Sequence, residues 1–141
     1  MLDPDFEQQL RDIYATAKTI AVVGATTNES KAGYFIPRYM QAEGYQIVPV
    51  NPRYAQVLGE PTYPALADVD VPVDVVDVFR PSDECPEIAR QAVAIGAKVL
   101  WLQPGVVSEE AAHIGEEAGM VVIMDRCIGM THAELDLGEG P

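Results

Sequence analysis

The chain has 141 residues, of which 48% are hydrophobic, and its formal net charge at pH 7 is -13. This length predicts one domain, residues 1–141, with a substantial hydrophobic core. The acidity argues against nucleic acid or an anionic membrane as a partner, because both require a basic surface. No apolar run approaches the ~20 residues of a membrane span, and the first residues do not have the layout of a signal peptide.

The chain has two cysteines, Cys85 and Cys127, which are far apart and fit neither a CxxC motif nor a metal-ligand spacing. No other residues form a metal-binding pattern, so we expect no metal site. Two reduced thiols in a cytoplasmic protein are the simpler interpretation, with a disulfide between them as the alternative.

Strands and helices are predicted to alternate along the chain. Residues 3–18 have apolar side chains at helical spacing, behind Asp3 as the expected N-cap and Pro4 at the first helical position. Further helices are predicted at 33–43, 81–97 and 108–119, and buried strands at 19–25, 45–51, 73–79, 98–103 and 120–125. Residues 52–69 are rich in turn formers, with one helical turn near 64–68, and a short helix and a tail end the chain.

This alternation predicts an α/β fold, a Rossmann-like domain with a five-stranded parallel sheet flanked by helices. In such sheets ligands bind beyond the carboxyl ends of the strands. The residues that follow each strand are therefore the candidate site.

Positive charge gathers at these strand ends. Of the nine lysines and arginines, four fall at or just after a predicted strand or its loop: Lys31, Arg53, Arg80 and Arg126. An edge rich in cations, next to a helix N-terminus, is typical of a site for a polyanion. The alternative is that these cations only neutralise neighbouring acids, which are Asp77, Asp83 and Asp125; Asp77, in particular, is a candidate partner for Arg80 or Arg126.

The loop after the first strand, "GATTNESKAG", resembles a phosphate-binding loop in part. Gly24 supplies a tight turn, Gly33 allows close helix packing, and Lys31 supplies a charge. The spacing is neither G-x-G-x-x-G nor a Walker A motif. After the second strand, Asn51, Pro52 and Arg53 replace the acid that usually binds the ribose of NAD, so NADP or the 3′-phosphate of coenzyme A (CoA) fits better than NAD.

Five blocks in order, "IAVVGAT", "GYQIVPVNP", "VDVVDVFR", "GAKVLWLQPGV" and "VVIMDRC", resemble the small stand-alone CoA-binding proteins. Their fold is similar to the N-terminal CoA-binding domain of the succinyl-CoA synthetase α-subunit. The resemblance spans roughly residues 10 to 135. It implies a CoA site of twelve residues: Gly24, Ala25, Thr26 and Lys31 at the phosphates, Asn51, Pro52 and Arg53 near the adenosine end, Phe79, Arg80 and Pro81 along the nucleotide, and Gln103 and Gly105 beside the pantetheine.

In the synthetase, the phosphorylated histidine and the ligase chemistry lie outside this domain, and neither His113 nor His132 has a phosphohistidine context here. The resemblance therefore implies binding of CoA or an acyl-CoA by a sensor, carrier or regulator, either monomeric or homodimeric.

Two alternatives stay open. One is an enzyme, either a small NADP-dependent oxidoreductase or a thiol enzyme that uses Cys127, which follows Arg126 and precedes His132. The other is an interaction subunit that has lost its ligand.

Overall fold

Five parallel strands form the centre of the molecule in the computed structural model, which describes residues 2–137. They are β1 (Thr19–Val23), β2 (Gln46–Val50), β5 (Val75–Val78), β6 (Val99–Leu102) and β7 (Val121–Ile123). Their order in the sheet is β2-β1-β5-β6-β7. The predicted Rossmann-like α/β fold with a five-stranded parallel sheet is confirmed.

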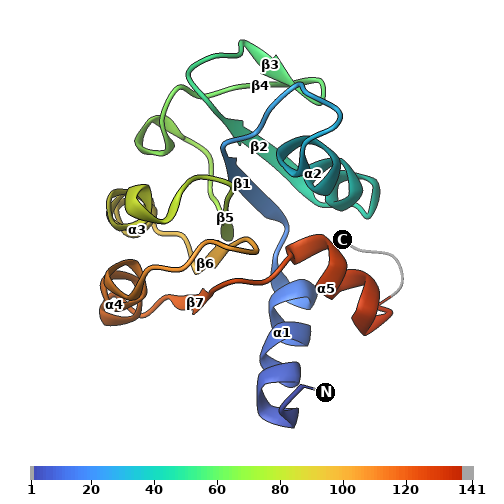
Figure 1. Ribbon diagram of the computed structural model, residues 1–141, viewed down its shortest axis with the longest axis vertical. Coiled ribbons are helices and arrows are strands. Elements are labelled where there is room, and N and C mark those ends of the chain that lie inside the picture. Colours follow the sequence, from blue (N-terminus) through green and yellow to red (C-terminus); the bar gives the residue numbers. More distant parts are fainter. Residues whose placement is uncertain (1, 138–141) are drawn as a thin grey trace.

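Helices cover both faces of this sheet (Figure 1). One face packs against α1 (Pro4–Thr16), α2 (Ala32–Ala42) and α5 (Ile128–Leu135), and the other against α3 (Cys85–Ala94) and α4 (Glu109–Glu117). Two cores result, because side chains that alternate along each strand enter opposite faces. Trp101 of β6 is fully buried in the core beside α1.

Local signals set the helix ends. The Asp3 carboxylate accepts hydrogen bonds from the backbone N–H groups of Asp5 and Phe6, so the predicted N-cap of α1 is confirmed. Ser108 caps α4 through the N–H of Ala111, at 3.1 Å. The helix predicted at 81–97 is instead a 3₁₀ turn, Ser82–Glu84, followed by α3. The end of the expected C-terminal tail lies outside the described residues.

The turn-rich segment after β2 contains a small hairpin that the sequence did not indicate. Its strands, β3 (Gln56–Val57) and β4 (Glu60–Pro61), are antiparallel. Leu58 and Gly59 join them with φ angles of 55° and 77°. A two-residue hairpin turn needs such left-handed residues. The predicted helical turn is confirmed as a 3₁₀ turn at Leu66–Asp68. Among residues 2–137, none of the helices is long and apolar enough to cross a membrane.

Candidate functional site

The candidate site lies where the path of the chain through the sheet reverses. From β1 the chain moves through α2 to β2 at one edge, then returns to β5 on the other side of β1 and continues outward (Figure 1). Loops that leave β1 and β5 therefore diverge, and this leaves a crevice at the carboxyl ends of the strands.

Two glycines allow the loop after β1 to pack closely against the segment after β5 and against α2. Gly24 has a φ of 94°, and a Cβ there would lie 3.0 Å from the Phe79 carbonyl oxygen and 3.1 Å from the Arg80 Cδ. A Cβ on Gly33 would lie 2.8 Å from the carbonyl oxygen of Gly24, a distance that real Cβ contacts do not reach. The two roles predicted for these glycines, the turn and the close packing of α2, match this geometry.

A proline inside α2 also helps to hold this loop. Pro37 has no N–H, so the carbonyl of Gly33, four residues earlier, loses its usual helical donor. The backbone N–H of Thr26 donates to that carbonyl instead, at 3.3 Å. The buried Pro37 thus frees an acceptor that ties the loop to the helix.

The N-terminus of α2 opens toward this loop. Lys31 is its N-cap residue, and no side chain caps the helix. Its first N–H groups therefore favour an anion, as does the positive end of the helix dipole. Within the loop, the Thr26 hydroxyl accepts from the Asn28 N–H and is 3.0 Å from the Tyr54 hydroxyl. The latter contact joins the β1 loop to the loop after β2.

Asn51 joins the same two loops from the end of β2. Its side-chain amide donates to the Ala25 carbonyl at 2.9 Å, and its side-chain oxygen accepts from the Arg53 N–H at 2.9 Å. Asn51 thus fixes the backbone that carries Arg53, a structural task that an acid could perform only in part because it lacks the amide donor.

These loops enclose a cavity of about 760 Å³ together with α3 and residues 64–66. This volume lies within the range of typical small-molecule sites, roughly 300–1,000 Å³. Eight of the twelve predicted site residues line it: Gly24, Thr26, Lys31, Asn51, Pro52, Arg53, Phe79 and Arg80. Its apolar wall includes Val23, Val50, Leu66 and Ile88. The cavity thus combines cations with an apolar wall.

The other four predicted residues are not among those that line the cavity. Ala25 is fully buried and contributes its carbonyl to Asn51. Gln103 is buried too, whereas Pro81 and Gly105 are exposed, and the N–H of Gly105 donates to the Asp125 carboxylate at 2.7 Å. Their predicted contact with CoA stays a prediction.

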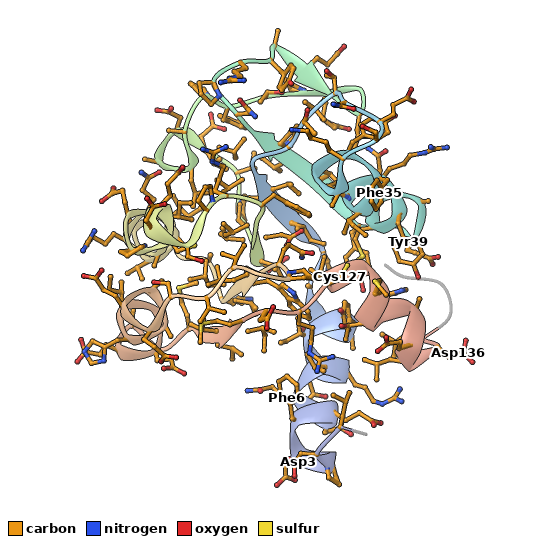
Figure 2. All side chains as sticks on the ribbon, viewed as in Figure 1. Asp3, Phe6, Phe35, Tyr39, Cys127 and Asp136 are labelled. Atoms are coloured by element: carbon orange, nitrogen blue, oxygen red, sulfur yellow. The ribbon has the colours of Figure 1, made fainter. Side chains whose placement is uncertain are left out.

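Three of the four cations predicted at the strand ends meet at the cavity, and Arg126 does not. Its guanidinium carbon lies 5.5 Å from the centre of the Phe6 ring on α1. Figure 2 shows Phe6 near the outer end of α1, on the opposite side of the molecule from the β2 loops. The cause is the strand order, which puts β7 at the far edge of the sheet from β2.

The structure adds site residues that the sequence did not reveal. These are Val23, Ala32, Val50, Tyr54, Pro64, Ala65, Leu66, Glu84, Ile88 and Gln91. Glu84 is the most consequential, since it forms two hydrogen bonds with the guanidinium of Arg80, at 3.0 and 2.6 Å. In the sequence, the only signal for this ion pair was the spacing of four residues between Arg80 and Glu84.

The expected ion pair of Asp77 with Arg80 or Arg126 is wrong. Asp77 is 1% exposed and faces the α1 side of the sheet, where the Gln103 amide donates to it at 2.5 Å. Burial raises the pKa of this carboxyl to about 8, and the hydrogen bond from Gln103 opposes the rise only in part. Asp77 is thus mostly a neutral acid at pH 7.

Cys127 lies between β7 and α5, where Figure 2 labels it. Its sulfur accepts from the Met130 N–H at 3.4 Å, as a helix cap. His132 does not form a dyad with it, because its Nδ1 is 2.9 Å from the Tyr39 hydroxyl and its buried Nε2 has no hydrogen-bond partner. Both cysteines are buried and free.

We expect both cysteines to react slowly with iodoacetamide at neutral pH in the folded protein and quickly in denaturant. Burial raises the pKa of Cys85 to about 11, which leaves almost no thiolate there. The measurement is mass-spectrometric quantification of each carbamidomethyl peptide over time. Labelling of Cys127 far faster than Cys85 in the native protein would revive the thiol-enzyme alternative.

Comparison with known proteins adds the family. The family model described as CoA binding domain matches residues 18–133. This chain belongs to that family. The match covers the loop after β1, the loop after β2 and the Arg80 segment, so all three cavity cations lie inside it.

Relatives of this family member are either similarly small or much larger. The uncharacterized protein YneT of Bacillus subtilis (strain 168) is 38% identical over 125 residues, which cover 89% of this chain and 93% of YneT. A hypothetical protein from Pyrococcus horikoshii OT3 has a similar structure, with a TM-score of 0.89, 34% identity and coverage of 92% and 91%. Acetate–CoA ligase [ADP-forming] I of Archaeoglobus fulgidus is 24% identical, over 84% of this chain but only 19% of the ligase.

Proposed function

We propose that this protein binds CoA or an acyl-CoA in the cavity at the carboxyl end of the sheet, as a sensor, carrier or regulator rather than a ligase. The observation that carries the proposal is the meeting of Lys31, Arg53 and Arg80 at the uncapped N-terminus of α2. In a chain of net charge -13, this gathering of three of the nine cations in one cavity calls for an anionic ligand.

CoA fits this cavity chemically. Its pyrophosphate and 3′-phosphate require several cations and N–H donors, which Lys31, Arg53, Arg80 and the first turn of α2 supply. Its adenine requires an apolar or aromatic surface, which the half-buried Tyr54 and Phe79 and the exposed Pro64 of the cavity lining offer. Membership of the CoA binding domain family supports the same ligand.

A binding role is supported by the part of the ligase that the match covers and by the placement of the two histidines. The part of the Archaeoglobus fulgidus ligase that resembles this chain is 19% of that enzyme, whereas almost all of YneT is matched. In the part of the chain that the structure describes, neither histidine is among the residues that line the cavity: His132 is buried against Tyr39, and the exposed His113 of α4 lies beside Glu117.

Thermal unfolding with added nucleotides separates this proposal from its alternatives. We expect CoA to raise the melting temperature and NADP to change it little, because a ligand that binds only the folded state stabilises it. The measurement is a fluorescence melt of protein stripped of carried-over nucleotide, with CoA, NADP and no ligand. A shift with NADP alone would favour the oxidoreductase, and no shift with either would favour an interaction subunit.

A further inference from the structure

The cavity contains one acid, Glu84, and it is bound to a cavity cation. Glu84 Oε1 accepts from Arg80 Nε at 3.0 Å, and Glu84 Oε2 accepts from Arg80 Nη2 at 2.6 Å. Both residues line the cavity, and each side chain is 45% exposed. Among the three cations of the cavity, Arg80 alone makes an ion pair within residues 2–137.

The position of Arg80 is fixed at both ends of its side chain. Its stem passes over Gly24, where a Cβ would come within 3.1 Å of the Arg80 Cδ. Its guanidinium is held by Glu84, which turns two of its five N–H donors away from any other acceptor. The Arg80 side chain is therefore already positioned for a phosphate in the cavity. However, the Nε–Nη2 side of its guanidinium, which could bind a phosphate with two hydrogen bonds, is occupied by the Glu84 carboxylate.

We propose that Glu84 is an internal counterion that a ligand phosphate displaces from Arg80. The inference rests on the proposed function for its ligand, but its physical basis is the ion pair. Exposed pairs of this kind are weak and are screened by salt. A phosphate can replace the carboxylate as a bidentate partner of the guanidinium.

Glu84 has a second place to go once it is displaced. It is the N-cap residue of α3, yet its side chain makes no cap hydrogen bond there. The N-terminus of a helix favours a carboxylate. Once released, the Glu84 carboxylate still lies at the positive end of the α3 dipole. Glu84 thus competes with weakly charged anions for Arg80, whereas a polyanion displaces it.

The test is calorimetric titration of wild type, E84Q, R80A and R80A/E84Q, each with CoA and separately with inorganic pyrophosphate. We expect E84Q to bind both probes roughly two- to fivefold more tightly, the range that loss of an exposed competing ion pair allows. The gain is expected to be clearly smaller in the R80A background, where E84Q relieves only the repulsion between an unpaired carboxylate and the ligand, and to shrink as salt is added. Asp83→Asn is the matched control, since it removes an exposed neighbouring charge that acts on Arg80 only through space, without a hydrogen bond, and should change affinity much less than E84Q.

Weaker or unchanged binding by E84Q would overturn the inference, because Glu84 would then position Arg80 rather than compete for it. A gain that is equally large without Arg80, or that D83N reproduces in full, would show only a general charge effect and would overturn it too. If wild type binds pyrophosphate but not CoA, and E84Q binds pyrophosphate more tightly than wild type, the proposed function fails but the role of Glu84 as a counterion is supported. If neither probe binds any variant, both fail.

Discussion

Replacing Lys31 by alanine is expected to weaken CoA binding by roughly 5- to 30-fold, equivalent to about 1–2 kcal/mol. Lys31 is the cation at the N-terminus of α2, and within the described residues its ammonium makes no ion pair. Its whole charge is therefore available to a phosphate. Arg80→Ala is expected to weaken binding less, because Arg80 has to leave Glu84 before it can bind a phosphate fully.

Isothermal titration at several salt concentrations measures this effect. Each lost cation should also reduce the salt dependence of binding, because fewer charges are then screened. Lys18→Ala is the control, since Lys18 is exposed and precedes β1 at the amino end of the strand, away from the cavity at the carboxyl ends. Unchanged affinity in both Lys31→Ala and Arg80→Ala would show that the site lies elsewhere.

Asp77→Asn is expected to stabilise the fold at and above neutral pH, by ~2–4 kcal/mol at pH 8. The buried carboxyl has a pKa of about 8 in the folded protein, against about 3.9 in an unfolded chain. Between these values the folded state retains a proton that the unfolded state releases. Wild-type stability should therefore fall, relative to D77N, as pH rises from about 4 to 8, by at most ~1.4 kcal/mol per pH unit.

Urea unfolding of wild type and D77N from pH 5 to pH 9 checks this prediction. Asparagine matches the shape of the protonated acid and still accepts from Gln103, so the core should be kept. Asp83→Asn, at an exposed position, should leave the pH profile as in wild type. A constant difference between wild type and D77N across this range would show that Asp77 does not bind a proton on folding.

The parallel sheet was predictable because each strand is a short apolar run and each helix has one apolar face. The glycines of the first loop were predictable for a similar reason, since Gly24 and Gly33 stand where a turn and a close helix contact are required. The hairpin was not. Its turn places Leu58 at a φ of 55°, a conformation that leucine rarely adopts, so no local signal marked it.

The sequence was enough to predict that the site lies at the carboxyl ends of the strands, but not which side chains line it. The sequence does not give the strand order, and this order separates Arg126 from the other three cations. The alternation along β5 also turns Asp77 toward Trp101 and α1, whereas the strand residues that line the cavity, Val23 and Val50, face the α3 side. Tyr54 and Glu84 reach the cavity through loop geometry that no spacing rule captures.

Calorimetric titration of the nucleotide-free protein with CoA and with dephospho-CoA tests the central claim most directly. The cation-lined cavity predicts that CoA binds, that loss of the 3′-phosphate weakens binding, and that NAD and NADP bind more weakly than CoA. Absence of CoA binding together with binding of NADP would contradict the account and assign the cavity to a dinucleotide.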